Sequence, residues 1–362
     1  MTRPTMPVTE VVREAWRDLA TGAGAAVACA VVLAALLGGV VGLRTLTIAG
    51  DVRAAAEWVA SGAATQVFTA AGRIDGRTCS ALVDEPDVLA AGAFRRLDDG
   101  VLIAALPGTS IPTYEVTSGA TALFSVTGTT GGPGVVVAPD VAEELGVRPG
   151  EQIVTPDGPV PVAGVYSYPD DGRDPDLAYA VLAPTAVDDA PFDACWATTW
   201  PEDETAGAAL RRTLLPAKGS EDGERSTLGQ LNPRSGTAFA PSRLPAPNLL
   251  EGAALGLGLA VGSAAVFRRR LPIASDRHVG VSTAAQALGV AVQHLVWGAI
   301  GALLALAVSV VLVRGLPSGD GLPIVEGAAL LCGLGLVGAV AGGAAAVPLV
   351  RERALHRYFR TR

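Results

Sequence analysis

The residue types that do most enzyme chemistry are few in this chain. Its histidines are His278, His294 and His356, and its single lysine is Lys218. A Ser-His-Asp triad is not expected in the long polar segment of residues 44–246, because every histidine follows that segment. No Gly-x-x-x-x-Gly-Lys-Ser/Thr phosphate loop occurs, so the chain is not expected to hydrolyse ATP by itself. These residues predict a non-catalytic chain without a cofactor of its own.

Four carboxylates fall within one short acidic turn. Carboxylate oxygens are ligands that calcium prefers, so the turn is a candidate metal site. The glycine placement and the distal glutamate of an EF-hand loop are missing, which favours a solvated turn. We therefore predict no metal site in this chain. The four residues are Asp170, Asp171, Asp174 and Asp176.

The cysteines divide into two pairs by their surroundings. Cys29 and Cys332 lie in apolar stretches, where a thiol behaves as a small apolar side chain. Cys79 and Cys195 lie in the polar segment, where an oxidising compartment favours one disulfide, with two free buried thiols as the alternative. His294 also lies in an apolar stretch, and it is either an ion or proton group or a partner for a neighbouring helix.

Four apolar stretches must position all of these residues. Hydrophobic residues make up 50% of the chain and charged residues 17%, and the charges largely avoid the stretches. At about 1.5 Å per helical residue, each stretch is long enough to cross a hydrocarbon core about 30 Å thick. Small residues four apart, Gly258 with Gly262 and Gly338 with Gly342, permit close approach of two such helices. The predicted spans are residues 23–43, 249–267, 288–313 and 327–350, with a short external loop at 314–326.

Basic residues in the short segments predict the orientation. Positively charged short loops are retained in the cytoplasm, whereas long domains cross largely regardless of charge. Basic residues precede the first span, fill the loop of residues 268–287 and form the tail of residues 351–362. We therefore expect a multi-pass protein of the cell membrane with both termini in the cytoplasm. The residues are Arg3, Arg13, Arg17, Arg268, Arg269, Arg270, Arg277, Arg351, Arg353, Arg357, Arg360 and Arg362.

The predicted external segment of residues 44–246 is strongly acidic. It holds 14 basic and 27 acidic residues, a net charge of −13. Nucleic acid and anionic lipid headgroups would be repelled, so neither is expected as a partner of this domain, while cationic ligands remain possible.

Local patterns predict an α+β fold for this domain. Alternating strands and helices are expected, the helix of residues 140–145 being capped by Asp140 and closed by Gly146. Residues 54–67 are expected to prolong the first span as a helical stalk, and residues 202–247 read as a linker. Residues 1–22 contain an amphipathic helix with Val12, Trp16 and Leu19 on one face. The predicted strands are 67–74, 101–105, 121–126, 134–138, 160–165 and 177–182, and a second helix is predicted at 79–91.

Two segments and the overall layout carry a family resemblance. "GVVVAPDVAEELGVRPGEQIV" followed by "VPVAGVY", residues 134–154 and 160–166, is similar to a strand, helix, Pro-Gly-Glu turn and returning strands of the FtsX/MacB family of ABC transporter permeases. The basic stretch of residues 268–312 resembles the family's route into its third span, with Arg277 to Gly280 as its "R-x-x-G" step. An acidic residue that commonly follows the basic cluster in the family is replaced here by "LPIAS" at 271–275.

The resemblance implies a membrane protein of four transmembrane helices, one before and three after a large extracytoplasmic α+β domain. It also implies a permease that works with a second copy or paralogue and with a separate cytoplasmic ABC ATPase, which would bind ATP and Mg²⁺. The residues that it suggests for ATPase coupling are Arg268, Arg269, Arg270, Asp276, Arg277, His278 and Gly280; the alternative for the three adjacent arginines is a plain positive-inside anchor.

Two other classes of function remain open from the sequence. One is a membrane-anchored binding or sensor protein that recognises an external ligand without any ATPase. The other is an embedded enzyme, which is disfavoured because no catalytic constellation lies at a matched depth.

Overall fold

The structure is a computed structural model that describes residues 6–22, 25–104, 106–128, 133–185, 190–201, 205–216 and 226–351. The chain divides into two compact units. The first comprises residues 1–53 and 241–362, and the second comprises residues 54–240. The predicted basic tail beyond Arg351 and the arginine at position 3 lie outside the described residues.

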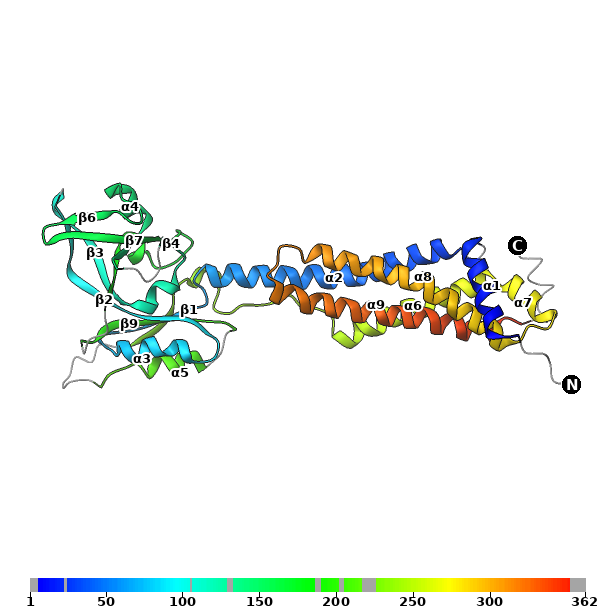
Figure 1. Cartoon of the computed structure of the whole chain (residues 1–362). Coiled ribbons are helices and arrows are strands. Elements are labelled where there is room, and N and C mark those ends of the chain that lie inside the picture. The colour runs from blue at the N-terminus through cyan, green and yellow to red at the C-terminus, as the bar shows by residue number, and fades with distance from the viewer. Residues whose placement is uncertain are drawn as a thin grey trace. The chain divides into compact units, whose positions relative to one another are not determined.

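The first unit is helical (Figure 1). Among the described residues, four helices are long and apolar enough to cross a membrane: α2 (Ala26–Ala60), α6 (Pro247–Arg268), α8 (Thr283–Leu312) and the segment Gly319–Leu349, which covers α9 (Ser318–Ala346) and the turn η5 (Val347–Leu349). A large sheet-containing domain is inserted between the first and the second of these helices, as predicted. Two shorter helices complete the unit, α1 (Val8–Ala20) and α7 (Arg270–His278).

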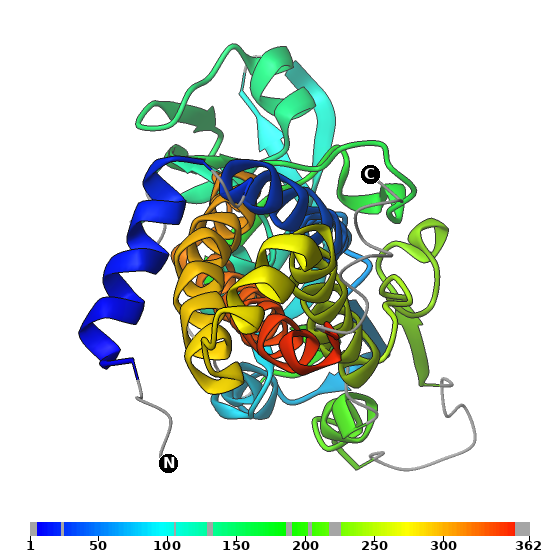
Figure 2. The ribbon, with the colours of Figure 1, turned by 90° about the vertical axis from the view of Figure 1, so that its right-hand side faces the viewer.

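Apolar side chains of α2, α8 and α9 form the core of the bundle. Leu33, Leu37 and Val41 of α2 have no exposed surface and belong to one buried cluster with Trp297 and Ala339. Figure 2 shows these helices nearly end on, with α1 lying across the outside of the bundle.

The amphipathic helix α1 packs through a different face from the one predicted. Val11 and Ala15 are buried, whereas Val12 and Trp16 are exposed, Trp16 by 63%. The exposed Trp16 is compatible with an interfacial anchor and not with packing on a neighbouring helix within the chain.

The buried polar groups in the bundle bond across helices. The ring Nδ1 of His294 lies 3.0 Å from the carbonyl oxygen of Ala339, and its ring meets that of Trp297 edge to face. The hydroxyl groups of Thr45 and Ser309 are 2.9 Å apart. These pairs give His294 a structural partner on α9, because buried polar groups must be satisfied within the bundle.

Helices α6 and α9 touch through their backbones. A Cβ atom on Gly258 would lie 2.1 Å from the carbonyl oxygen of Gly335, and one on Gly262 would lie 2.0 Å from that of Ala339. On the opposite helix, Cβ atoms on Gly338 and Gly342 would each lie 2.3 Å from a carbonyl oxygen of α6. The small residues spaced by four therefore bring two helices of the same chain together.

We expect the substitution Gly262→Ala to destabilise the bundle by about 1–3 kcal/mol, because the added methyl group overpacks a backbone contact. The matched control is Gly256→Ala on the same helix, where an added Cβ has nothing within 4 Å. Thermal unfolding of the detergent-solubilised chain measures both variants. Equal melting temperatures for Gly262→Ala and the wild type would contradict the contact.

The second unit is built on a mixed sheet. Among the described residues the strand order is β10-β1-β9-β2-β3-β8-β5-β7-β4, and β6 pairs with β7. The β3–β8 and β5–β7 pairs are parallel and the others are antiparallel. The strands are β1 (Thr65–Ile74), β2 (Val88–Ile103), β3 (Leu106–Thr117), β4 (Val126–Gly128), β5 (Val135–Val137), β6 (Gln152–Thr155), β7 (Gly158–Tyr166), β8 (Val181–Thr185), β9 (Phe192–Thr199) and β10 (Thr227–Gln230).

Two short helices cover one face of β1, β9 and β2. The helices α3 (Gly76–Ala81) and α5 (Thr205–Arg211) form a buried cluster with alternate residues of these strands, among them Phe68, Ala93 and Phe192. Side chains of the other parity, such as Phe94 and Trp196, belong to a separate cluster. The alternation follows the two-residue period of a strand, which places successive side chains on opposite faces.

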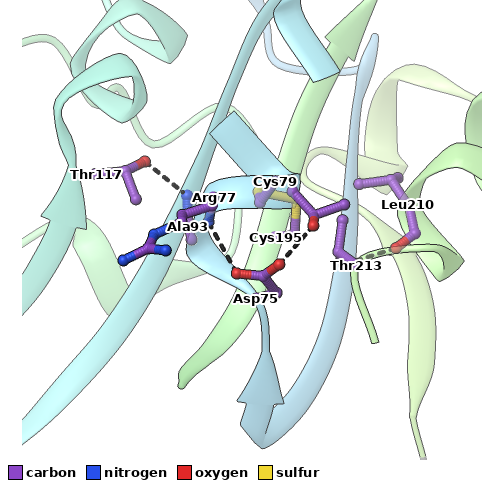
Figure 3. The surroundings of a disulfide bond; sticks show 9 residues. Asp75, Arg77, Cys79, Ala93, Thr117, Cys195, Leu210 and Thr213 are labelled. Atoms are coloured by element: carbon purple, nitrogen blue, oxygen red, sulfur yellow. Dashed lines mark hydrogen bonds between the residues drawn. A yellow bond between two sulfur atoms is a disulfide. The ribbon is translucent and has the colours of Figure 1, made fainter. Parts of the chain in front are cut away.

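A disulfide joins α3 to β9, an interior strand of the sheet. Cys79 and Cys195 are bonded, with 116 residues of separation and no exposed surface (Figure 3). Closing a loop of this size stabilises the folded state by about 4–5 kcal/mol on the chain-entropy account. The disulfide prediction is confirmed, and Cys29 and Cys332 are buried free thiols.

Several local predictions were wrong. The predicted strand of residues 121–126 is mainly the 3₁₀ turn η2 (Ser118–Leu123), which packs so closely on β2 that a Cβ on Gly92 would lie 2.4 Å from Ala120. The predicted helix of residues 79–91 ends at Ala81 and gives way to the turn η1 (Leu82–Asp84) and then β2, because Pro86 cannot continue a helix.

The predicted linker and one predicted cap also differ from the structure. Residues 202–247 contribute α5 and β10, and Ala209 and Leu210 of α5 are buried in the core. Helix α4 (Pro139–Leu145) begins one residue earlier than expected, with Pro139 at its first position and Asp140 inside the first turn rather than at the cap. Gly146 closes this helix with a φ of +63°, as predicted.

Candidate functional site

The seven sequence-predicted coupling residues all lie at the junction between α6 and α8. Arg268 ends α6, Arg269 separates it from α7, and Arg270 begins α7. The chain leaves α7 through Gly280, whose φ of +101° is a conformation that favours glycine. The side chain of Ser282 then caps α8 by accepting a hydrogen bond from the backbone N–H of Ala285.

Arg269 is bonded to two other helices. Its guanidinium donates to the carboxylate of Asp18 on α1 at 2.5 Å and to the amide oxygen of Gln293 on α8 at 2.7 Å. The amide nitrogen of Gln293 also donates to Asp18, at 3.0 Å. The three side chains therefore close a ring of hydrogen bonds among α1, α8 and the start of α7. Charge-assisted hydrogen bonds are stronger than neutral ones. A displacement of α7 would therefore pull on α1 through Asp18.

Arg277 connects the other end of α7 to the end of α9. It donates to the backbone carbonyls of Val347 at 3.0 Å and Val350 at 2.5 Å, and to the side chain of Gln286 on α8. Gln286 in turn donates to the carbonyl of Ile273 on α7, at 2.7 Å. Carbonyl groups at a helix end have no partner within the helix, and Arg277 supplies one.

The remaining predicted residues lie on the outside of the junction. Arg268, Asp276 and His278 are exposed, and Arg270 is half-buried. Arg269 and Arg277 hold the helices together, whereas the side chains of Arg268, Asp276 and His278 lie at the surface of the junction.

A groove of about 280 Å³ lies between α1 and the junction. Its lining includes the carboxyl groups of Glu14, Asp18 and Asp276 together with Arg269 and Gln293. Partial burial, together with the nearby carboxylates of Asp18 and Glu14, raises the pKa of Asp276 above its usual range, and Arg269 opposes the shift. The groove therefore disfavours the charged form of Asp276.

We expect Asp276→Asn to raise the melting temperature of the chain at pH 7. The folded state raises the pKa of Asp276, so it binds the proton more tightly than the unfolded state does, and ionisation of this group at neutral pH costs stability. The difference between variant and wild type should shrink as the pH falls through the folded-state pKa, and it should vanish near about pH 3, below the unfolded pKa. Thermal unfolding across this pH range provides the measurement, and a lower melting temperature of the variant at pH 7 would contradict the assignment.

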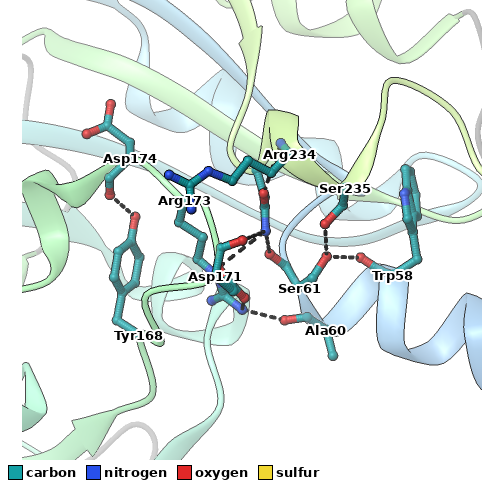
Figure 4. A network of polar contacts seen from close by, with 10 residues as sticks. Trp58, Ala60, Ser61, Tyr168, Asp171, Arg173, Asp174, Arg234 and Ser235 are labelled. Atoms are coloured by element: carbon teal, nitrogen blue, oxygen red, sulfur yellow. Dashed lines mark hydrogen bonds and ion pairs between the residues drawn. The ribbon is translucent and has the colours of Figure 1, made fainter.

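A second polar cluster, in the sheet-containing unit, holds the carboxyl end of α2. Arg173 donates to the carbonyl oxygen of Ala60 at 2.6 Å and pairs with Asp171 (Figure 4). Asn232 donates to the carbonyl oxygen of Ser61 at 2.9 Å, and Gln230 donates to that of Ala63 at 2.6 Å. Side chains of the sheet domain therefore pair the last carbonyl group of the helix and two carbonyl groups of the segment that follows it.

Aromatic packing reinforces the same helix end. The ring of Trp58, in the last turn of α2, lies 5.8 Å from that of Trp200 and 6.2 Å from that of Phe239. Trp58 is 8% exposed and shares a buried cluster with Ala63 and Ala64. We call these hydrogen bonds and ring contacts the α2 joint.

The acidic turn is occupied by structural contacts. Asp171 pairs with Arg173 and also accepts from Asn232, and the carboxylate of Asp174 accepts from the backbone N–H of Asp176. Within the part of the chain that the structure describes, no three His, Cys, Asp or Glu residues are grouped to hold a metal ion.

Removing Arg173 should loosen the α2 joint. The side chain is 8% exposed, so Arg173→Ala leaves the carbonyl of Ala60 and the Asp171 carboxylate without this partner. We expect a local cost of about 2 kcal/mol, and hence amide hydrogen exchange roughly thirtyfold faster at residues 61–65. The control is Arg148→Ala, an exposed arginine of the same unit that should leave exchange at these residues unchanged. Unaltered exchange in Arg173→Ala would show that the joint does not depend on this arginine.

Sequence reasoning missed the partners of the coupling residues. The partners of Arg269 are Asp18 and Gln293, and the side-chain partner of Arg277 is Gln286. In the sequence these are single polar residues in or beside apolar helices. Their polarity alone could have indicated a role, because a polar side chain within an apolar span needs a hydrogen-bond partner on a neighbouring helix.

Comparison with known proteins gives little further information. No protein-family model matches the chain, and no curated protein matches it. Among solved structures, the periplasmic region of MacB from Actinobacillus actinomycetemcomitans matches 41% of this chain and 80% of its own, with 11% sequence identity and a TM-score of 0.32. A superposition this loose leaves the function to be inferred from the residues themselves.

Proposed function

We propose that this chain is the permease subunit of an ABC transporter of the FtsX/MacB type. It couples ATP hydrolysis by a separate cytoplasmic ATPase to movement of an extracytoplasmic domain. The observation that carries the proposal is the layout, in which one apolar helix precedes a large sheet-containing domain and three apolar helices follow it. The segments of residues 134–166 and 268–312 resemble that family in sequence. The proposed orientation follows from the basic residues in the short segments that flank the apolar helices.

The α6–α8 junction supports a coupling role. Arg268, Asp276 and His278 are exposed on the outside of the junction, where an ATPase would push. Arg269 and Arg277 tie the same short helix to α1, α8 and the end of α9. A displacement of α7 would therefore pass to the bundle through several charge-assisted bonds at once.

The α2 joint supports the outward half of the mechanism. Helix α2 is continuous from Ala26 to Ala60, and its last turn is held by side chains of the sheet domain. A helix with a firmly held end transmits a tilt or shift rather than absorbing it in a loose hinge. In this proposal the external domain moves, and it acts mechanically on something outside the membrane.

The full chain, purified from its own membranes in mild nonionic detergent, should bring with it a protein that hydrolyses Mg-ATP. A second permease, either a copy of this chain or a paralogue, should accompany it. The measurement is ATP hydrolysis in the eluate, with identification of the accompanying chains by mass spectrometry. A mock purification from cells that lack the affinity tag controls for contaminating ATPases.

The alternative is an external binding or sensor protein that needs no ATPase. It predicts the same membrane topology but no associated nucleotide-hydrolysing protein. An eluate that retains this chain in folded form and contains no ATPase, even after mild crosslinking in cells, would favour that alternative and contradict the permease.

A further inference from the structure

A groove of about 420 Å³ lies on the face of the sheet opposite the disulfide. The helices α3 and α5 cover the other face of β1, β9 and β2, and the groove lies over the face that they leave. The groove has space because the β1 side chains that line it are short: they are Val67, Thr69 and Ala71. These side chains are small beside the aromatic rings of the neighbouring strands. The volume lies within the range of about 300–1,000 Å³ typical of small-molecule sites.

Aromatic rings from four places in the chain line this groove. Phe94 of β2 and Trp196 of β9 are stacked, with ring centroids 4.4 Å apart, and Tyr114 of β3 and Tyr168 join them. Tyr168 is held in place because its hydroxyl donates to the carbonyl oxygen of Asp174 at 2.5 Å. The guanidinium of Arg173 also lies 5.5 Å from the centre of its ring. Rings arranged in this way favour a cation, because each face carries the negative part of the ring quadrupole.

The charges at the groove agree with a cationic occupant. Asp174, Asp176 and Asp193 line it together with Arg96, and the guanidinium of Arg173 lies beside the ring of Tyr168, so carboxylates outnumber the positive groups. Asp193 accepts the backbone N–H groups of Gly72 and Arg96, whereas the described residues donate no hydrogen bond to the carboxylate of Asp176. Burial raises the pKa of Tyr114, with Asp176 and Asp174 adding to the shift and Arg96 opposing it.

One buried donor in the lining lacks a partner. Trp196 is 8% exposed, and among the described residues its indole Nε1 has no hydrogen-bond acceptor. A buried N–H without an acceptor is unfavourable. The Nε1 atom has less than 1 Å² of accessible surface, so a ligand oxygen accepts from it only when the indole turns toward the groove. The occupant that matches the carboxylates, the rings and this donor is therefore a cation that also carries an acceptor oxygen.

We propose that this groove is a binding site for a small organic ammonium ion whose apolar body carries a carbonyl or ester oxygen. The ammonium group lies among the aromatic rings beside Asp176, and the oxygen accepts from the indole of Trp196. The site belongs to this chain alone, so binding requires neither an ATPase nor a second permease, and its test is independent of the transport proposal.

Isothermal titration calorimetry on the full chain in nanodiscs of neutral lipid tests the site. The probe is benzoylcholine, which combines a quaternary ammonium group, an ester and an apolar ring. Its neutral carbon analogue, 3,3-dimethylbutyl benzoate, is the matched control. We expect the cation to bind at least about tenfold more tightly than the neutral ester, consistent with about 1–2 kcal/mol for cation–π and carboxylate attraction.

Three substitutions separate the contributions. Asp176→Asn should weaken benzoylcholine binding about fivefold, and Trp196→Phe should weaken it by a similar factor because it removes the donor but keeps the ring. Arg96→Gln removes the opposing charge from an exposed side chain and should tighten binding about threefold. A gain in affinity cannot result from misfolding, so this variant keeps the test informative if the others unfold.

Any of three results would overturn the proposal. The first is equal affinity for the cation and its neutral analogue, because the groove would then be only an apolar surface. The second is no heat of binding for benzoylcholine at millimolar concentration. The third is an affinity that Arg96→Gln lowers or leaves unchanged in a folded chain.

Discussion

The proposed mechanism depends on how the carboxyl end of α2 is held. An α-helix leaves its last carbonyl groups without partners, and here Arg173 donates to the last carbonyl of the helix, that of Ala60. Asn232 and Gln230 donate to the carbonyls of Ser61 and Ala63 just beyond it. Trp58 adds ring packing at the same place. Because the donors come from distant parts of the sheet domain, the helix end cannot turn without breaking several bonds together. The acidic turn, which in the sequence looked like solvated charge, supplies part of this joint through Asp171 and Arg173.

A similar principle organises the other end of the bundle. Arg269 and Arg277 each contact more than one helix, and in both cases the partner on α8 is a glutamine. Arginine suits this role because its planar guanidinium presents several donors in fixed directions. Between the two ends, α6 and α9 are joined by glycines at backbone contact distance, which leaves little freedom for sliding. The helical unit therefore combines close packing along its length with the hydrogen bonds of Arg269 and Arg277 at one end.

Much of this fold was predictable from periodicity and composition. The four apolar helices, the inserted α+β domain and the Cys79–Cys195 disulfide follow from hydrophobic runs, local strand and helix patterns, and the oxidising compartment expected for the domain. The stalk also follows, but only in part: it was predicted over residues 54–67, whereas the helix ends at Ala60 and β1 begins at Thr65. The α5 helix and β10 were missed because their segment is short and rich in Pro, Gly and charge, and because burial of Leu210 depends on a strand about 140 residues away. The η2 turn was mistaken for a strand because its packing on Gly92 is a tertiary constraint that a local pattern does not contain.

The candidate sites were predictable only in part. The residues proposed for coupling were named from charge and from a family resemblance, but the partners of Arg269 and Arg277, which are Asp18, Gln286 and Gln293, come from other helices. The groove over β1, β9 and β2 was not predictable, because Phe94, Tyr114, Tyr168 and Trp196 are separated by up to about 100 residues in the chain and meet only through the strand order. The acidity of the domain was visible in the sequence, yet which carboxylates line a cavity was not.

The central claim is that the sheet domain faces the outside of the cell while the α6–α8 junction faces the cytoplasm. It is tested most directly by thiol labelling of intact cells, since the four native cysteines are either buried or bonded to each other. A single new cysteine is introduced by Ser118→Cys in the sheet domain or by Ser275→Cys in α7, both at exposed positions. The account predicts that a membrane-impermeant maleimide labels the first variant in intact cells and the second only after permeabilisation. The reverse pattern would contradict the account.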